Sequence, residues 1–320
     1  MTLTELLAAV RRVEVRTNRL VNDTMVGAYL SRFKGRGMDF EELREYIPGD
    51  DIRDIDWNVT NRMGRPFVKR YREERELTMV LAVDVSASST FGSLRRTKRE
   101  FAAEIASTLA ASAARSSDKV ALLLFTDQVE LFVPPRKGRR HILRIIREMI
   151  SFEPKHRGTD IPAAMTFLNH VLRRRSIVFL LTDFLHSDAG VADARAGSPL
   201  PAVGAHGVMR PAERDVISEL GLTNASHDLV CLHLHDPRES ELPNAGMLTM
   251  EDAETGEVLE LDSGRFAVRE KFARLNVERL AALDLAFNRA GVDTLRFNTA
   301  EAFAATLQRF FETRRGRRRG

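Results

Sequence analysis

Short apolar runs recur along this chain between residues 77 and 300, and they limit its fold more than any other feature. They span residues 77–83, 120–125, 177–182 and 228–234. Runs of about four to eight residues without polar alternation are typical of strands that are covered on both faces. Apolar residues at helical spacing lie between the runs, such as Phe101, Ile105 and Leu109. The alternation predicts an α/β domain with a doubly wound, Rossmann-like and mostly parallel sheet.

The sequence around these runs predicts the remaining elements. Residues 129–133 follow a polar turn and are expected to pair antiparallel, as a strand at the edge of the sheet. Residues 252–256 are expected to join two short extended pieces as a hairpin. A further strand is expected over residues 293–297. Helices are expected over residues 94–115, 139–150, 161–174, 211–221, 264–290 and 300–314.

The first 76 residues have a different pattern and are predicted to form a helical and irregular segment packed on the α/β domain. Residues 3–30 space their apolar side chains as an amphipathic helix does. The polar stretch that follows is expected to be anchored by its aromatic residues, which are Phe40, Tyr46, Trp57 and Phe67. Opposite charges gather beside one of them, at Arg53, Asp54 and Asp56. Two interpretations of this group are open: a half-buried ion-pair cluster, which we favour, or a surface of these residues and Trp57 that binds a partner.

The chain is accordingly divided into residues 1–76, an α/β domain at 77–313 and a basic tail at 314–320. Within the domain, residues 186–210 are rich in Ala, Gly, Pro and Ser and are expected to form a flexible insertion. The net charge is +4, but the five arginines of the tail exceed it. The remainder is therefore slightly acidic, and nucleic acid is not the expected partner.

The composition also indicates a cellular compartment. The single cysteine, Cys231, lies in an apolar run, so the chain has no disulfide framework and suits a reducing environment. No stretch reaches the roughly 18 consecutive apolar residues of a transmembrane span, and the first residues lack the apolar core of a signal peptide. We therefore expect a cytoplasmic protein without a transmembrane segment.

Oxygen-bearing side chains stand where the predicted strands end. Asp84, Ser86 and Ser88 follow the first apolar run, Thr159 lies in a turn that opens a helix, and Asp183 closes the third run. The carboxyl ends of parallel strands meet at one edge of a sheet, so we expect these side chains to lie close together. Carboxylate and hydroxyl oxygens suit Mg²⁺, with Mn²⁺ or Ca²⁺ as alternatives, far better than zinc. In the alternative interpretation, the serines cap the next helix and the aspartates cap loops.

A D-x-S-x-S loop, a distant Gly-Thr and a Thr-Asp that closes a strand resemble the metal-ion-dependent adhesion site of von Willebrand factor A domains. The resemblance covers residues 77–300. It implies that Ser86 and Ser88 bind Mg²⁺ through their hydroxyls and that Thr159 binds directly or through water. It also implies that Asp84 and Asp183 act directly or through bridging waters. An ion with few carboxylate ligands stays electrophilic, so it would recruit an acidic residue from a partner protein.

A second resemblance extends to the residues before the sheet. The pieces GRGMDF, REYIPGDD, RDIDW and NR in residues 35–62, together with residues 236–239 and 252–256, resemble a prokaryotic family known only as domain of unknown function fifty-eight. Members of that family are commonly encoded beside MoxR-type AAA+ ATPases, which implies such an ATPase as a partner. Two features depart from the pattern: the insertion at 186–210, and Ser89 where the family has a methionine. Longer relatives carry membrane helices ahead of the signature, so this sequence is expected to be the short soluble form.

These patterns favour a protein that is not an enzyme. The eight histidines show no metalloprotease spacing, and His233 and His235 are expected to be core or edge residues. No phosphate-binding loop is present, so the chain is not itself the ATPase. The expected function is a Mg²⁺-dependent interaction module, an adaptor or co-chaperone of a MoxR-type ATPase. It would act in the assembly, maturation or metal insertion of a client protein that supplies an acidic metal ligand. The alternatives are a metal-dependent hydrolase at the same site and a nucleic-acid or membrane-surface binder that uses the arginine tail.

Overall fold

The computed structural model describes residues 37–74, 77–93, 96–185, 216–254 and 256–316. The helix expected over residues 3–30 and the insertion expected at 186–210 lie outside the described residues.

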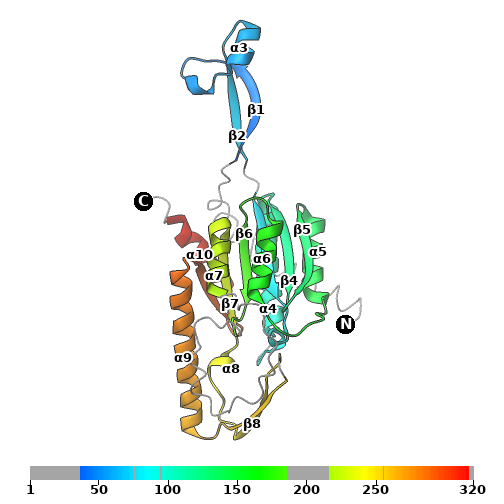
Figure 1. The fold of residues 1–320 in the computed structure, drawn as a ribbon, viewed down its shortest axis with the longest axis vertical. Helices are drawn as coiled ribbons and strands as arrows, with labels where there is room; N and C mark the ends of the chain where they lie inside the picture. Colours follow the sequence, from blue (N-terminus) through cyan, green and yellow to red (C-terminus); the bar gives the residue numbers. More distant parts are fainter. Residues whose placement is uncertain (1–36, 75–76, 94–95, 186–215, 255, 317–320) are drawn as a thin grey trace.

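A six-stranded sheet forms the centre of the molecule (Figure 1), in the order β10-β7-β6-β3-β4-β5. β3, β4, β6, β7 and β10 are parallel, and β5 pairs antiparallel with β4 at one edge. This confirms the doubly wound α/β fold and the antiparallel edge strand. The strands are β3 (Thr78–Asp84), β4 (Lys119–Phe125), β5 (Val129–Arg136), β6 (Ile177–Thr182), β7 (Asp228–His235) and β10 (Asp293–Asn298).

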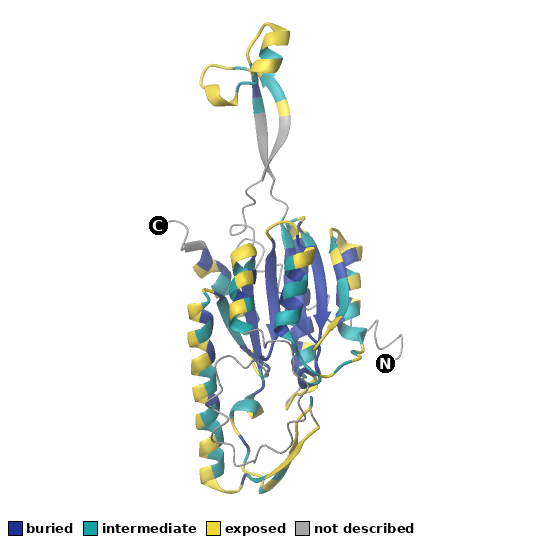
Figure 2. Cartoon of the chain, in the orientation of Figure 1, coloured by how far each residue is buried: buried dark blue, intermediate teal, exposed yellow. Residues whose placement is uncertain are grey.

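Helices cover both faces of the sheet. One face packs against α4 (Lys98–Arg115), α5 (Arg139–Ser151) and α10 (Ala304–Gly316). The other face packs against α6 (Ile161–Val171), α7 (Val216–Ser226) and α9 (Phe266–Arg289). Figure 2 shows the central strands as buried along most of their length.

Strand β3 shows why the apolar runs lack polar alternation. Met79, Leu81 and Val83 enter the core on one face, and Val80 and Ala82 enter the core on the other. All five are at most 3% exposed. Burying a valine or leucine side chain contributes roughly 1.5–3 kcal/mol, so apolar residues are favoured at every position of such a strand. The same two-sided burial leaves polar residues only at the strand ends.

Residues before the sheet form an antiparallel hairpin of β1 (Gly37–Glu45) and β2 (Phe67–Glu74). Its connection contains a short 3-10 helix (Ile52–Asp54) and α3 (Trp57–Met63). The hairpin extends away from the sheet in Figure 1. Trp57 is 61% exposed, so the expectation that this side chain anchors the segment to the α/β domain is wrong. The segment is ordered instead by the hydrogen-bonded pairing between β1 and β2.

The charged residues near Trp57 do not form the ion-pair cluster that we favoured. Asp56 caps α3 by accepting hydrogen bonds from the backbone N–H groups of Asn58 and Val59, and its carboxylate lies 3.1 Å from the ammonium of Lys69. Arg53 and Asp54 are exposed. The capping position draws Asp56 towards the helix terminus and the neighbouring strand, which leaves the other two charges in solvent.

Two further elements lie beyond the carboxyl end of β7. α8 (Pro237–Ser240) follows that strand directly, and β8 (Met247–Glu251) pairs antiparallel with β9 (Val258–Asp262). The backbone N–H of Gly256 donates to the carbonyl of Asp252, so the predicted turn at residues 252–256 is confirmed. This second hairpin lies below the sheet in Figure 1, on the side where β7 ends.

The basic tail does not begin at residue 314, as the expected domain division had it. Arg314 belongs to α10, is 8% exposed and donates to Asp228 at 2.8 Å. It also pairs with Asp293. Arg314 is therefore part of the folded domain rather than the first residue of a solvated tail. Among the described residues, no helix is both long and apolar enough to cross a membrane.

Candidate metal centre

The end of β3 and the loop that follows it hold three of the predicted ligands. Asp84 Oδ1 accepts a hydrogen bond from the backbone N–H of Ser86 at 2.9 Å. The hydroxyl oxygens of Ser86 and Ser88 lie 3.1 Å apart, and both serines are buried. Ser86 precedes a short 3-10 helix (Ala87–Thr90), yet its side chain makes no capping hydrogen bond. The interpretation of this serine as a helix cap is therefore wrong, and its hydroxyl lies beside that of Ser88. The other half of that interpretation is confirmed, because Asp84 and Asp183 cap their loops by accepting from the N–H groups of Ser86 and Leu185.

Asp183 reaches the same edge because β6 lies beside β3. The register pairs Val83 with Leu181, one residue before each strand's last residue. Thr182 Oγ1 donates to Asp84 Oδ2 at 2.6 Å. Burial and the nearby charge of Asp183 raise the pKa of Asp84 from 3.8 to about 6. The two carboxyl groups therefore repel each other in a space that excludes solvent.

Thr159 lies on a neighbouring loop, before α6. The backbone N–H of Ala87, between the two serines, donates to the carbonyl of Arg157 at 3.0 Å, which holds the two loops together. Asp160 caps α6 by accepting from the N–H of Ala163. The Thr159 hydroxyl itself donates to Glu254 Oε1 at 2.8 Å. The predicted ligand is thus already engaged with a carboxylate from the hairpin β8–β9.

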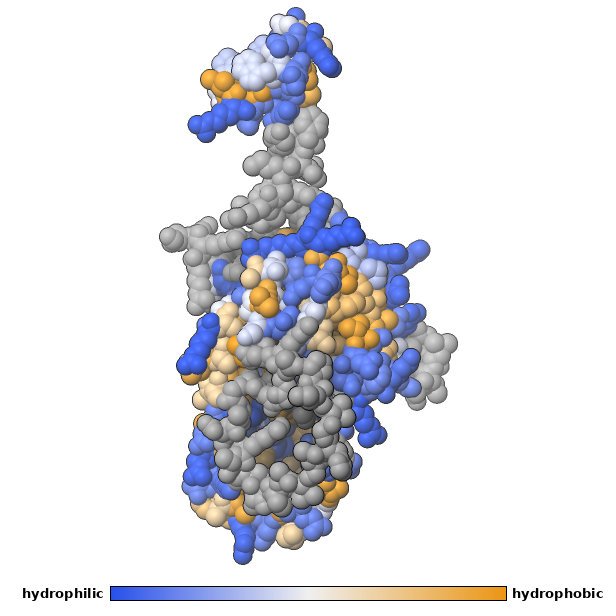
Figure 3. Space-filling model, in the orientation of Figure 1, coloured by the Kyte–Doolittle hydropathy of each residue, from blue (hydrophilic) through white to orange (hydrophobic). Residues whose placement is uncertain are grey.

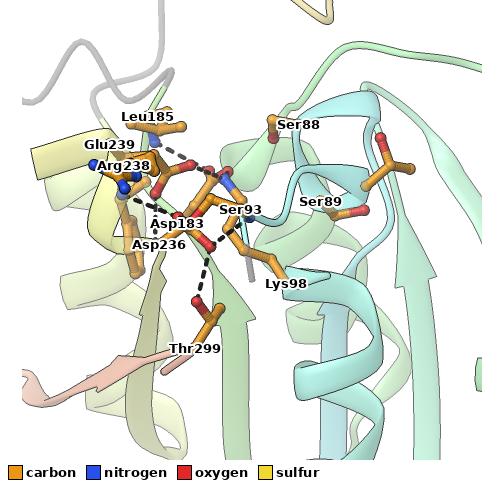
Figure 4. A network of polar contacts seen from close by, with 12 residues as sticks. Ser88, Ser89, Ser93, Lys98, Asp183, Leu185, Asp236, Arg238, Glu239 and Thr299 are labelled. Carbon is orange, nitrogen blue, oxygen red and sulfur yellow. Dashed lines mark hydrogen bonds and ion pairs between the residues drawn. The ribbon is translucent and has the colours of Figure 1, made fainter. Parts of the chain in front are cut away.

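Lys98 lies at the centre of the site and was not predicted. Its ammonium donates to Asp183 Oδ2 at 2.5 Å and to the carboxylate of Glu239 (Figure 4), and the side chain is 2% exposed. Burial opposes the charge of Lys98, but Asp183 and Glu239 outweigh it and raise its pKa. Burial likewise acts to raise the pKa of Asp183, but the Lys98 ammonium lowers it below its ordinary value. Asp183 is therefore held as a carboxylate.

Asp236 links the segments that surround Lys98 by accepting several hydrogen bonds (Figure 4). Its side chain is completely buried and accepts hydrogen bonds from both the backbone N–H and the hydroxyl of Ser93. It also accepts from the N–H of Arg238 and from the hydroxyl of Thr299, at 3.0 and 2.9 Å. The carboxylate joins the ends of β7 and β10 to the loop that leads into α4. Residues 236–239, singled out in the sequence, thus position Lys98 through Ser93 and Glu239.

Four predicted ligands lie together: Asp84 at the end of β3, Ser86 and Ser88 on the loop that follows it, and Asp183 directly after β6. The described contacts of Asp84 come from neutral donors, so a dication beside it would offset its repulsion from Asp183. Ligands about 2.0–2.1 Å from Mg²⁺ and at right angles are about 3 Å apart, and the two serine hydroxyls have this spacing. The described residues contain no group of three or more His, Cys, Asp or Glu suited to a metal. The two carboxylates and two hydroxyls described above are oxygen donors of the kind that a hard cation such as Mg²⁺ prefers.

The remaining predicted residues lie elsewhere. Arg53, Asp54, Asp56 and Trp57 belong to the hairpin β1–β2, away from this edge in Figure 1. His233 is 1% exposed and packs edge-on against the ring of Phe184, as expected of a core histidine. Burial, aided by nearby positive charges, lowers the pKa of His233 to about 3.

Comparisons with known proteins identify a family and several similar proteins. A model of the family described as "Protein of unknown function DUF58" matches residues 42–281. Uncharacterised proteins of Mycobacterium tuberculosis and Mycobacterium bovis are 30% identical over 314 residues, which is 97% of this chain and 90% of theirs. Among solved structures, BatB of Bacteroides thetaiotaomicron is similar over 74% of this chain and 98% of its own, with 13% identity and a TM-score of 0.43. The SpRpn10 VWA domain is similar over 72% of this chain and 93% of its own, with 10% identity and a TM-score of 0.35.

Proposed function

This chain belongs to the DUF58 family, and we propose that it is a Mg²⁺-dependent protein-interaction module. The observation that carries the proposal is the convergence of Asp84, Ser86, Ser88 and Asp183 at one edge of the sheet. Two buried carboxylates and two hydroxyls in this space suit Mg²⁺, and Mn²⁺ or Ca²⁺ would use the same oxygens. When bound, the ion would supply an electrophilic centre for a partner's carboxylate.

The surrounding residues favour binding over catalysis. Both oxygens of Asp84 accept hydrogen bonds, from the N–H of Ser86 and the hydroxyl of Thr182. Asp183 accepts from Lys98 and from the N–H of Leu185. These contacts fix the positions of both side chains, and Lys98 keeps Asp183 ionised by lowering its pKa, so Asp183 is poorly suited to take up a proton as a general base. The site is better suited to holding an ion than to moving protons.

The partner that we propose is a MoxR-type AAA+ ATPase, with this chain acting as its adaptor or co-chaperone towards a client protein. An Asp or Glu of the client would approach the metal edge. The hairpin β1–β2 provides a second surface, because it carries exposed apolar side chains among hydrophilic ones (Figure 3). They include Ile47, Ile52, Trp57 and Met63, which are 59–64% exposed. The charged residues Arg53 and Asp54 lie beside them and belong to the same candidate surface.

Metal titration tests the site. Isothermal calorimetry of the full chain should show Mg²⁺ binding in the wild type and a loss of about tenfold or more in affinity in Ser86→Ala and Ser88→Ala. Thr90→Ala is a matched control, since this hydroxyl lies on the same loop but is exposed and donates to the carbonyl of Ala87. Equal affinity in all four proteins would refute the site.

Capture of the ATPase tests the partner. A purified MoxR-type ATPase encoded beside the chain should be retained by the immobilised wild type in Mg²⁺ and released by EDTA. Ser86→Ala should behave in Mg²⁺ as the wild type does in EDTA. Retention that ignores EDTA would show that the metal does not bridge the two proteins.

A further inference from the structure

A carboxylate of this chain already contacts one of the predicted metal ligands, Thr159. Glu254 Oε1 accepts a hydrogen bond from Thr159 Oγ1 at 2.8 Å, although the two residues are 95 positions apart. Glu254 belongs to the turn at the tip of the hairpin β8–β9. The chain thus brings to this edge the same functional group that a partner's acidic residue would bring.

The oxygen spacing is that of neighbouring metal ligands. Adjacent ligands on octahedral Mg²⁺ lie about 3 Å apart. The oxygens of Ser86 and Ser88 are 3.1 Å apart, and those of Thr159 and Glu254 are 2.8 Å apart. A hydrogen bond without any metal also has this length. Measured Mg²⁺ affinity therefore has to decide whether Glu254 is a metal ligand or only a hydrogen-bond acceptor of Thr159.

The hairpin depends on contacts at its two ends. An isolated two-stranded hairpin is marginally stable in water. This one exposes apolar side chains, with Met247 and Val258 more than 60% exposed. At its base, the N–H and hydroxyl of Ser263 both donate to the carbonyl of Gly246, at 2.7 and 2.8 Å. At its tip, the hydrogen bond between Glu254 and Thr159 joins it to the loop before α6. Breaking the tip contact would remove the hydrogen bond that ties Glu254 to the loop before α6.

We propose that Glu254 is an internal ligand of the metal site and that a partner's carboxylate displaces it. This inference rests on the proposed Mg²⁺-dependent binding and adds its regulation. With Glu254 bound, the site is complete within one chain and weak binders are excluded. Exchange of Glu254 for a partner's carboxylate releases the tip of the hairpin, so that binding at the metal changes the mobility of β8 and β9.

Two matched substitutions test the first half of this proposal. Calorimetric titration of the full chain with Mg²⁺ should show an affinity about tenfold or more weaker in Glu254→Gln. Glu251→Gln should bind as the wild type does, because Glu251 is an exposed glutamate of the same hairpin. Thr159→Val should also weaken the binding of Mg²⁺. Mg²⁺ should slow hydrogen exchange in residues 247–262 of the wild type but not of Glu254→Gln.

The outcomes separate this proposal from the one on which it rests. If the wild type binds no Mg²⁺, or binds it equally well after Ser86→Ala, the metal site itself is refuted. If Mg²⁺ binding depends on Ser86 but Glu254→Gln and Glu251→Gln bind Mg²⁺ with the same affinity, the metal site is supported and the role of Glu254 as its internal ligand is refuted.

Displacement is tested with acetate as a free carboxylate. In the Mg²⁺-loaded wild type, sodium acetate should speed exchange in residues 247–262, whereas sodium chloride at equal ionic strength should not. Equal exchange in the two salts would overturn the displacement.

Discussion

The ammonium of Lys98 lies 2.5 Å from Asp183 Oδ2, and neither side chain is more than 6% exposed. The same ammonium pairs with Glu239, so one buried cation connects the end of β6 to α8. Desolvating these charges is costly, and the ion pairs offset that cost only while all partners are present. Lys98 therefore controls both the charge of the candidate metal site and the position of Asp183.

Replacing Lys98 by methionine should destabilise the protein strongly. The substitution leaves Asp183 and Glu239 without their ammonium, and loss of one partner of a buried pair costs about 3–5 kcal/mol in free energy of unfolding. Mg²⁺ should restore more stability in Lys98→Met than in the wild type, because the ion replaces the missing positive charge. Urea denaturation with and without Mg²⁺ measures both effects. Lys69→Met, which breaks the half-exposed pair with Asp56, should cost much less; an equal loss would contradict a special role for Lys98.

Asp84→Asn should change how stability depends on pH. The pKa of Asp84 is raised from 3.8 to about 6, chiefly by burial, so folding favours the protonated form. The wild type without divalent metal should therefore lose stability as pH rises from about 4 to about 6 and remain less stable above that. Asp84→Asn lacks this loss and should be more stable than the wild type by about 1–3 kcal/mol at pH 8, with no gain at pH 4. Thermal unfolding in EDTA across this pH range measures the difference. A variant that is less stable than the wild type at pH 8 would contradict the prediction.

Asp236→Ala should loosen the support behind Lys98. The substitution removes the acceptor of hydrogen bonds from Ser93, Arg238 and Thr299, and it leaves buried donors unsatisfied. We expect a loss of about 3 kcal/mol or more, against about 1 kcal/mol for Thr299→Val, which removes one of these bonds. Urea denaturation gives both values, and hydrogen exchange should speed up in residues 96–98 and 237–240 of Asp236→Ala. Similar losses in the two variants would show that Asp236 does not act as the common acceptor.

Trp57 should report directly on the hairpin β1–β2. It is the only tryptophan in the sequence and is 61% exposed, so the native protein should have red-shifted fluorescence that acrylamide quenches readily. Trp57→Ala should change the free energy of unfolding by no more than about 0.5 kcal/mol. Binding of the proposed ATPase at this surface should shift the emission to the blue. Blue-shifted, protected emission from the free protein would instead show that the indole is buried.

Several features followed from the sequence alone because they depend on local pattern. Unbroken apolar runs require burial on both faces, which predicts a doubly wound sheet. The same rule places Asp84 and Asp183 at the carboxyl ends of strands, and neighbouring parallel strands deliver them to one edge. Turn residues act over only a few positions of the chain, so the hairpin turn at 252–256 could also be predicted from the sequence.

Which distant charges meet depends on how the helices and strands pack, and the sequence did not reveal it. Nothing in the pattern around Lys98 distinguishes it from a solvated lysine at the start of a helix, yet Asp183 and Glu239 lie 85 and 141 positions away from it and enclose its ammonium. The same holds for Glu254 at Thr159, and for Arg314 with Asp228. Trp57 is an error of the opposite kind: we expected this aromatic side chain to be buried, but it is exposed to solvent on the hairpin. Local spacing determines where a side chain stands on its own element, but its burial and its ionic partners depend on how the elements pack.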